Sequence, residues 1–449
     1  MTALIYALLA KQTIGTSLSR LGAVSLLLAA SCFLRAEEVR SLTILHLNDL
    51  HARLLPDDLK RGGFAYVAQA IRQERAKSDD VLVMHGGDLV QGTPVSTIFE
   101  GVPVYEVASQ LGLDFHTLGN HEFDYGWHKI REFMHKASFT TLSANVVNAQ
   151  GRLLTGEAYR IREVNGIKVG VIGLLTDKLS SLTRTSLMGP WKTLPIIDTV
   201  NKYVNLIGDR ADLIVVLAHI FPSEEDSILR SNKEISIIIS GHHHGGQNDV
   251  KEYQGRICVK TRPYGRELGR LDIEFDVESK RLVAYRWKRI PISTHEYLPD
   301  PATMKLVKKW ETRVAKIVDV PIGRSVRTFS RRELQQWIES AMMDAVGADI
   351  AYMNLGGIRD ELPKGEILAR HIWNIMPFNN LVVTARLRGS ELPKEVNADR
   401  AISAEREYVV ATNDFIAEKW RELGLPFKED GPVLRDVLID WVREHRVVR

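Results

Sequence analysis

Five apolar runs in the first two thirds of the chain each end abruptly in a cluster of Asp, Asn, His and Gly. With their polar ends they read LTILHLNDLH, DVLVMHGGDL, DFHTLGNHEFDYG, ADLIVVLAHI and EISIIISGHHH. Runs of this length that are rich in Val, Ile and Leu are typical of buried strands. Segments with helical periodicity lie between them, at residues 64–77, 104–112 and 196–209. Strands that alternate with helices predict an α/β architecture.

The polar ends of these runs predict a ligand site, because α/β sheets bind ligands at the carboxyl ends of their strands. A mixture of imidazole and carboxylate ligands fits divalent transition metals. The spacing of Asp49 and His51 places both side chains on one side of an extended segment, and His242 and His244 repeat it, whereas His243 points elsewhere. For this His triplet, chance composition and a pH-sensitive loop are the alternatives, and repetition at five strand ends favours a metal site. The candidate residues are Asp49, His51, Asp88, Asn120, His121, His219, His242 and His244.

Length and charge set further bounds. A chain of 449 residues is long enough for about two or three domains. With 59 Lys and Arg against 56 Asp and Glu, the charge is nearly balanced, which argues against a nucleic-acid polymer as partner. Around residues 293–321 a single helix is expected, with Asp300 as N-cap, Pro301 at the first position and an apolar stripe at Val307, Trp310, Val314 and Ile317. We read residues 41–292 as one domain, 293–321 as the linking helix and 322–449 as a second domain.

The first 36 residues have the marks of an export signal. Basic residues precede an apolar stretch that is too short to span a bilayer comfortably, and small residues follow it. Cleavage near Ala36 is one outcome. Acylation at Cys32 in LAASC, as in a bacterial lipoprotein, is a second, and an uncleaved anchor is a third. Each predicts a periplasmic or cell-surface protein, which contacts the membrane only through this segment.

Several strings together resemble a known family. NDLH, GGDLVQGTPVS, LGNHEFDYG, SANV, LAHIFPSEED and GHHH are similar, in order, to the motifs of the calcineurin-like metallophosphoesterases. More narrowly, the chain resembles the bacterial 5′-nucleotidase/UDP-sugar hydrolase family, densely over residues 42–277 and again in the C-terminal part. The resemblance implies an N-terminal β-sandwich flanked by helices, a linking helix and a smaller α+β domain that recognises the substrate.

The resemblance also implies roles for the polar strand ends. Asp49, His51 and His244 would hold one divalent ion, Asn120, His219 and His242 a second, and Asp88 would bridge the two. Zinc, manganese or cobalt would suit such a pair, which activates water and clamps the phosphoryl oxygens for in-line attack by a metal-bound hydroxide. His121 would stabilise the phosphoryl group or protonate the leaving oxygen, and Asp124 would orient His121; a simple turn cap is the alternative for Asp124.

In the C-terminal part, MNLGGIR, IMPFNN and VVATNDFIA resemble the nucleotide-recognition domain of the same family. Carried over by motif position, the substrate-binding residues would be Asn354, Gly357 and Arg359, the two base-stacking rings Phe378 and Phe415, and more weakly Arg331. The family's Gly-Gly-Asp-Gly turn, which binds the sugar hydroxyls, is absent after Phe415, and Asp430 with Gly431 comes only later. We therefore expect base stacking to dominate and the sugar hydroxyls to contribute little.

Three classes of function remain open at this point. The first is an exported two-metal phosphohydrolase that cleaves nucleotide monoesters. The second keeps this chemistry for a 2′,3′-cyclic nucleotide, a UDP-sugar, a sugar phosphate or a sulfur ester. The third is a non-catalytic surface binding protein, against which the complete set of metal ligands argues.

Overall fold

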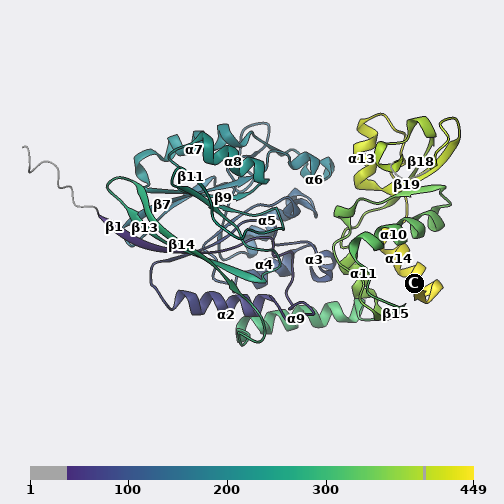
Figure 1. Ribbon diagram of the computed structural model, residues 1–449, viewed down its shortest axis with the longest axis horizontal. Helices are drawn as coiled ribbons and strands as arrows, with labels where there is room; N and C mark the ends of the chain where they lie inside the picture. Colours follow the sequence, from purple (N-terminus) through teal and green to yellow (C-terminus); the bar gives the residue numbers. More distant parts are fainter. Residues whose placement is uncertain (1–37, 398–400) are drawn as a thin grey trace, which may run out of the picture.

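Two facing six-stranded sheets form the larger, N-terminal part of the molecule (Figure 1). The computed structural model describes residues 38–397 and 401–449, so the predicted signal with Cys32 lies outside the described residues. The first sheet has the order β14 (Arg281–Pro291), β13 (Glu267–Asp276), β1 (Val39–Leu47), β2 (Val81–His85), β3 (Phe115–Thr117), β4 (Thr140–Leu142). The second has the order β11 (Lys251–Tyr253), β12 (Arg256–Val259), β10 (Ile237–Ser240), β9 (Leu213–His219), β7 (Ile167–Leu175), β6 (Tyr159–Val164).

The apolar runs are continuous because both faces of the central strands are buried. In β1, Leu42 and Ile44 join the core between the two sheets, whereas Leu45 and Leu47 join the core under the helices of the first sheet. That outer layer consists of α2 (Phe64–Arg75), α3 (Pro94–Ile98), α4 (Val102–Ala108), α5 (Trp127–Lys136) and α9 (Pro301–Val318). Helices α7 (Ile196–Ile207) and α8 (Pro222–Ser231) cover the other sheet. The predicted α/β sandwich is confirmed.

Parallel pairing brings the polar strand ends together. Strands β1 to β4 are parallel in one sheet, and β7, β9, β10 and β12 are parallel in the other. Their carboxyl ends therefore lie at one edge of each sheet. Short elements follow these ends: η1 (His121–Phe123), β5 (Val146–Val147), η2 (Leu179–Ser181), α6 (Thr185–Met188) and β8 (Lys192–Thr193), whereas η3 (Gly208–Arg210) lies between α7 and the start of β9.

Helix α9 connects the sandwich to the second domain and packs along α2 (Figure 1). It begins at Pro301, and the carboxylate of Asp300 caps it by accepting the backbone N–H of Thr303 at 2.8 Å. The prediction that Ile317 belongs to the buried stripe is wrong. Ile317 is 50% exposed, and Val318 takes the buried position, because it lies one helical turn after Val314 on the face that packs on the sandwich core.

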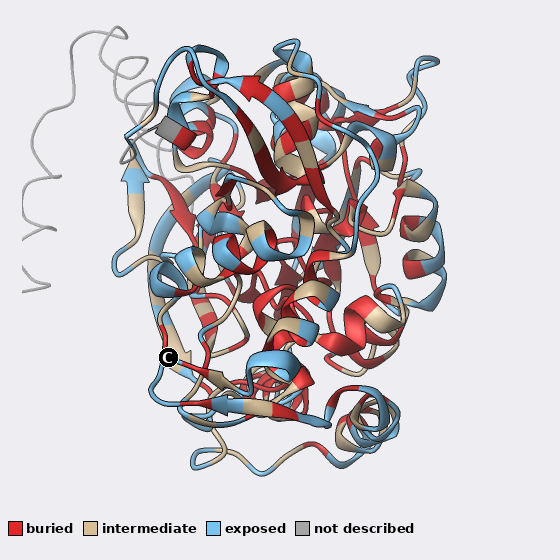
Figure 2. Cartoon of the chain, turned by 90° about the vertical axis from the view of Figure 1, so that its right-hand side faces the viewer, coloured by how far each residue is buried: buried red, intermediate tan, exposed pale blue. Residues whose placement is uncertain are grey.

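The second domain has two small sheets with helices packed on them. One sheet has the order β17 (Gly365–Leu368), β15 (Pro321–Ser325), β20 (Val447–Val448), and the other β16 (Ile350–Tyr352), β19 (Glu407–Asn413), β18 (Val382–Arg388). The remaining elements are α10 (Arg331–Val346), η4 (Leu355–Gly357), α11 (Ala369–Ile375), η5 (Gly389–Glu391), α12 (Lys394–Asn397), α13 (Asp414–Glu422) and α14 (Leu434–His445). Figure 2 shows buried residues gathered in the strands and exposed residues on the outward helix faces. Within the described ranges, no helix has both the length and the apolar character of a membrane span.

Candidate active site

Four of the predicted metal ligands have left-handed backbone conformations. The φ angles are 53° at Asp49, 47° at His51, 58° at Asp88 and 75° at His242. The prediction that Asp49 and His51 lie on an extended segment is therefore wrong, because the chain turns immediately after β1. Left-handed backbone is unfavourable for residues other than glycine, and such strain gathers at functional sites. In this protein the left-handed turns bring the ligand atoms of neighbouring residues close to one another.

The structure gathers the predicted ligands into three overlapping groups in which the ligand atoms lie within 4.8 Å of one another. The groups are Asp49, His51 and His244; Asp88, His219 and His242; and His51, Asp88 and His121. His242 and His244 thus divide between two groups, as the family resemblance implies, and do not fall in one group as their spacing suggested. His243 is exposed and belongs to none of the groups.

In the first group, two imidazoles face each other across the carboxylate of Asp49. The Nε2 atoms of His51 and His244 are 2.9 Å apart, and they lie 3.9 Å and 3.5 Å from Asp49 Oδ1. Asn48 donates a hydrogen bond of 2.7 Å to Asp49 Oδ2, and its own Oδ1 accepts the backbone N–H of Thr261. Asn48 therefore fixes the direction of the Asp49 carboxylate.

In the second group, His219 has its tautomer set by the backbone. Its Nδ1 donates to the carbonyl of Gly86 at 2.7 Å, so Nε2 faces Asp88 Oδ2 at 3.1 Å and His242 Nδ1 at 3.2 Å. Burial opposes protonation, but the negative charge of Asp88 prevails and raises the pKa of His219 to about 9. Electron-rich atoms this close require a positive charge between them, either a proton or a metal ion.

The donor set fits divalent ions. Asn120 lies next to Asp88 in the same cavity, and its Oδ1 is buried without a hydrogen-bond partner in the part of the chain that the structure describes. A buried carbonyl oxygen of this kind is costly unless something binds it. Imidazole nitrogens, carboxylates and one amide oxygen are the ligands that zinc, manganese and cobalt accept. The fold and these groups indicate bound divalent metal; that each predicted ligand acts as one stays a prediction.

Glu122 is a supporting residue that the sequence did not single out. Its buried carboxylate accepts the backbone N–H groups of Asp88 at 3.1 Å, Leu89 at 2.8 Å and Gly119 at 2.6 Å. Burial and the charge of Asp88 raise the pKa of Glu122 to about 7. The side chain thus joins the loops after β2 and β3. Its only signal in the sequence is its place inside GNHEF.

His121 and Asp124 form a pair at the rim of these groups. His121 Nδ1 donates to Asp124 Oδ2 at 2.8 Å, which leaves Nε2 free, 4.0 Å from Asp88 Oδ2. Burial lowers the affinity of His121 for a proton, but the charges of Asp124 and Asp88 outweigh it and raise the pKa of His121 above its usual value. The pair can therefore hold a proton next to the metal groups.

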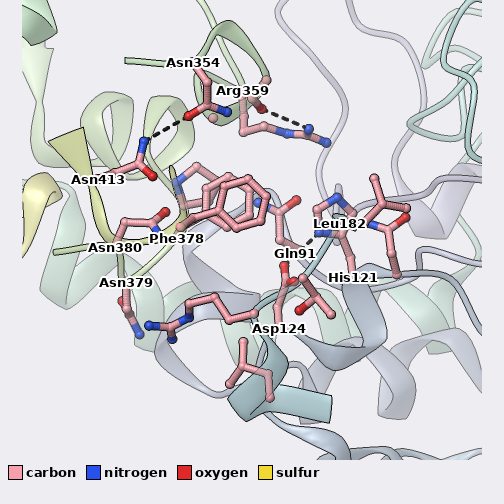
Figure 3. Close-up of a pocket in the computed structure, with 18 of the residues that line it drawn as sticks. Gln91, His121, Asp124, Leu182, Asn354, Arg359, Phe378, Asn379, Asn380 and Asn413 are labelled. Atoms are coloured by element: carbon pink, nitrogen blue, oxygen red, sulfur yellow. Dashed lines mark hydrogen bonds and ion pairs between the residues drawn. The ribbon is translucent and has the colours of Figure 1, made fainter. Parts of the chain in front are cut away.

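A cavity of about 600 Å³ extends from these groups to the second domain (Figure 3). Both domains line it. From the predicted substrate-binding set, the lining includes Asn354, Gly357, Arg359, Phe378 and Phe415. The ring centroids of His121 and Phe378 are 6.0 Å apart, so the second domain reaches the metal groups.

Arg331 is the predicted substrate residue that the structure places differently. It is not among the residues that line the cavity. Its Nε and Nη2 donate to the carbonyls of Ile358 and Leu355 at 2.5 Å and 2.9 Å, so the guanidinium supports the turn that carries Gly357. A direct contact with phosphate stays a prediction from the sequence alone.

Arg435 is a second residue that the sequence missed. Its side chain donates to the carbonyl of Phe378 at 3.2 Å and to Asn379 Oδ1 at 2.9 Å. The guanidinium lies over the ring of Trp373, 3.6 Å from its centroid. Arg435 comes from α14, far along the chain from the loop that it holds, and no local pattern in the sequence marks it.

Polar contacts join the domains on both sides of the cavity. Arg53 of the sandwich pairs with Asp360 at 3.0 Å on one side. On the other side, Arg184 pairs with Asp414 at 2.6 Å, and Lys419 donates to the carbonyl of Ser181 at 2.8 Å. The loop that runs from η2 to α6 is therefore held against α13, the helix that carries Phe415.

Two facing sheets, with His and Asp groups at the carboxyl ends of their parallel strands, have the form of a metal-dependent enzyme site. Residues 42–246 match the family described as calcineurin-like phosphoesterase, and residues 314–397 match the 5′-nucleotidase, C-terminal domain. Together the two matches place the chain among the calcineurin-like metallophosphoesterases that carry a 5′-nucleotidase C-terminal domain, and they indicate a metal-dependent phosphoric ester hydrolase.

Individual relatives agree with this assignment. Over 421 residues the chain is 26% identical to a 5′-nucleotidase of Vibrio cholerae, covering 81% of this chain and 76% of that protein. It is 26% identical over 398 residues to endonuclease YhcR of Bacillus subtilis, covering 80% of this chain but 32% of YhcR, so it spans about a third of that relative. The crystal structure of a 5′-nucleotidase precursor from Thermus thermophilus has the same fold, with a TM-score of 0.83 at 22% identity, covering 91% and 97% of the two chains.

Proposed function

We propose that the chain is an exported 5′-nucleotidase-like enzyme that hydrolyses nucleotide monophosphates with two bound divalent ions. One observation carries this proposal. A single cavity runs from the grouped His and Asp side chains to Phe378 and Phe415, and both domains line it. A nucleotide has the matching form, with a phosphate at one end and an aromatic base at the other. Export rests on the sequence of residues 1–36 alone.

Each ligand group has a proposed ion. Asp49, His51 and His244 would hold one, Asn120, His219 and His242 the other, and Asp88 would contact both. When bound, a pair of divalent ions supplies positive charge at the phosphoryl oxygens and makes water a better nucleophile near neutral pH. The left-handed turns that carry Asp49, His51 and Asp88 hold these ligands in place before substrate enters.

His121 is proposed to act on the leaving group. Its Nε2 faces the cavity while Asp124 holds Nδ1, so the ring presents a proton at a fixed position. Because its pKa is raised, His121 stays protonated to a higher pH than a free imidazole. It can therefore stabilise charge on the phosphoryl group and give its proton to the departing oxygen of the sugar.

The second domain is proposed to bind the nucleoside. Phe378 and Phe415 would stack on the base, which is worth about 1–3 kcal/mol per base and depends little on base identity. Arg359 lines the cavity and lies close enough to influence the charge on His51 and His121, so it is suited to bind the phosphate. Asn354 Oδ1 accepts a hydrogen bond of 2.9 Å from Asn413, which orients its amide toward the same space.

The test is a substrate panel with the purified chain, stripped of metal and reloaded separately with zinc, manganese or cobalt. Phosphate release is compared for AMP, UMP, glucose 6-phosphate, 2′,3′-cyclic AMP and UDP-glucose, with sulfur-ester cleavage and degradation of single-stranded DNA measured alongside. We expect the nucleoside monophosphates to have the highest kcat/KM. Efficient turnover of a sugar phosphate or a sulfur ester, with little on AMP or UMP, would contradict the proposed substrate class.

A further inference from the structure

Gln91 lines the cavity, and its side-chain amide makes no hydrogen bond within the described part of the chain. Its side chain is 1% exposed and lines the same cavity as His121 and Phe378. Neither Nε2 nor Oε1 has a hydrogen-bond partner among residues 38–397 and 401–449. A buried amide that lacks both hydrogen-bond partners is unfavourable, so its position calls for a ligand that supplies them.

The backbone holds this amide in place. Gln91 has a φ of 70°, and its N–H donates to Ser96 Oγ at 2.9 Å. Ser96 Oγ also accepts the hydroxyl of Tyr125 at 3.0 Å. At the next residue, Gly92, an added Cβ would lie 3.0 Å from the carbonyl oxygen of His51, so this loop packs directly on the metal-ligand loop. Gln91 thus has a fixed place relative to the metal groups, and its strained φ is typical of a functional position.

Gln91, Phe378, His121 and Asp124 line the same cavity, and in the view of Figure 3 the Gln91 side chain is drawn between the Phe378 ring and the pair of His121 and Asp124. A nucleotide with its phosphate at the metal groups and its base on Phe378 places its sugar between these two ends. Gln91 therefore lies where the sugar would be.

The chemistry of an amide selects the group that it recognises. A side-chain amide has one hydrogen-bond acceptor and two donors. A phosphate oxygen can only accept a hydrogen bond, and the face of a stacked base neither donates nor accepts one. A hydroxyl both donates and accepts, so it can meet both needs of Gln91 at once. The sugar of a nucleotide carries hydroxyls at the expected place.

The acidic residues of the second domain do not offer this contact. Asp430 is exposed and is not among the residues that line the cavity. The carboxylate of Asp414 is already used, because Oδ1 accepts from Asn380 and Oδ2 from Arg184, each at 2.6 Å. These two carboxylates leave the sugar contact to other residues that line the cavity, and Gln91 is one whose side-chain amide has both groups unpaired in the described part of the chain.

We propose that Gln91 is a specificity-determining residue that binds a sugar hydroxyl of the nucleotide through its side-chain amide. This inference rests on the proposed function, and it replaces the expectation from the sequence that the sugar hydroxyls contribute little. The catalytic domain then supplies the sugar contact that the missing Gly-Gly-Asp-Gly turn would make in the family.

The first experiment uses the metal-loaded full chain and compares kcat/KM for AMP, 2′-deoxy-AMP and 3′-deoxy-AMP. One lost hydrogen bond, together with a Gln91 amide left unpaired, predicts that at least one deoxy substrate is hydrolysed about tenfold less efficiently. Equal values for all three overturn the inference about Gln91 and leave the proposed function intact. No hydrolysis of AMP by an enzyme that cleaves p-nitrophenyl phosphate overturns the proposed function itself.

The second experiment replaces the amide. Gln91→Leu keeps the size of the side chain but removes the donor and the acceptor, and the ratio of kcat/KM for AMP to that for the disfavoured deoxy substrate should fall toward one. Gln73→Leu, on the exposed side of α2, is the matched control and should keep the wild-type ratio. Gln91→Asn, whose side chain tolerates a positive φ, is measured in parallel and should also lower the ratio, because its amide is drawn back by one methylene.

Two results of the second experiment would overturn the assignment. A folded Gln91→Leu protein with an unchanged ratio would show that the amide does not recognise the sugar. An equal loss on AMP, on both deoxy substrates and on p-nitrophenyl phosphate would show that Gln91 acts on the phosphoryl group or only on the fold. If the Leu variant does not fold, the Asn variant and the wild-type ratio decide the matter in the same way.

Discussion

Replacing Asp88 by Asn should separate the two effects of the carboxylate that the ligand groups share. The side chain is buried, and Oδ2 lies 3.1 Å from His219 Nε2 and 3.8 Å from His51 Nε2, so it faces both groups. Oδ1 accepts the backbone N–H of His121 at 3.0 Å. An asparagine side chain at this position would keep the shape and this hydrogen bond but would remove the negative charge between the proposed ions.

The expected magnitude for Asp88→Asn follows from linkage. An ion present at a hundred times its Kd stabilises the folded chain by about 2.7 kcal/mol, so two ions contribute about 5 kcal/mol. At about 2–4 °C per kcal/mol for a domain of roughly 250 residues, the wild-type Tm should rise by about 10–20 °C on metal loading. The variant should lose at least half of this rise, and its kcat should fall by at least about three orders of magnitude, or roughly 4 kcal/mol.

The assay compares Tm with and without EDTA, bound metal by elemental analysis, and AMP hydrolysis for each protein. The difference in Tm between the two conditions cancels any effect of the substitution on the metal-free fold. Asp79→Asn, at an exposed position, is the matched control and should behave as wild type. A folded Asp88→Asn protein that binds two ions and turns over within tenfold of wild type would refute the assignment of Asp88 as the shared ligand.

Five further substitutions test the other roles. His121→Asn should keep its metal by elemental analysis but lose about two to four orders of magnitude in kcat, and loss of an ion would make His121 a ligand instead. Asp124→Asn should move the alkaline limb of the kcat/KM profile to lower pH, because removing a negative charge lowers the raised pKa of His121; an unshifted limb would contradict the pairing. Phe378→Ala and Phe415→Ala should each cost about 1–3 kcal/mol in kcat/KM for AMP and less for p-nitrophenyl phosphate, and equal losses would make them core residues. Arg435→Met should raise KM for AMP about tenfold with a smaller effect on kcat, since it releases the Phe378 loop, and an unchanged KM would contradict this support.

The sandwich could be predicted from the sequence because strands that are buried on both faces are apolar at consecutive positions. Runs such as Ile237–Ser240 are apolar without alternation, and they end where the polar ligands begin. Helix α9 was predictable for a similar reason, since Asp300 and Pro301 are local start signals. Its last turn was not, because a helical stripe continues from Val314 equally well at a spacing of three residues, to Ile317, or of four, to Val318, and only the packing shows that Val318 is buried.

The candidate metal ligands were proposed from repetition, and the structure groups them, but the reasoning from their spacing failed at Asp49 and His51. Period two holds only in extended chain, and both residues are in left-handed turns. Gln91 and Arg435 could not be predicted. The unpaired amide of Gln91 and the contact of Arg435 with Phe378 exist only after distant segments pack together.

The central claim is that two divalent ions act together on a nucleotide phosphate, and a stoichiometric titration tests it most directly. Metal-free chain is titrated with manganese or zinc while bound metal and phosphate release from AMP are measured in the same samples. We expect activity to remain low through the first equivalent, to rise as the second binds, and to reach its plateau at two ions per chain. Full activity with one ion bound, or two bound ions without hydrolysis of AMP, would contradict the account.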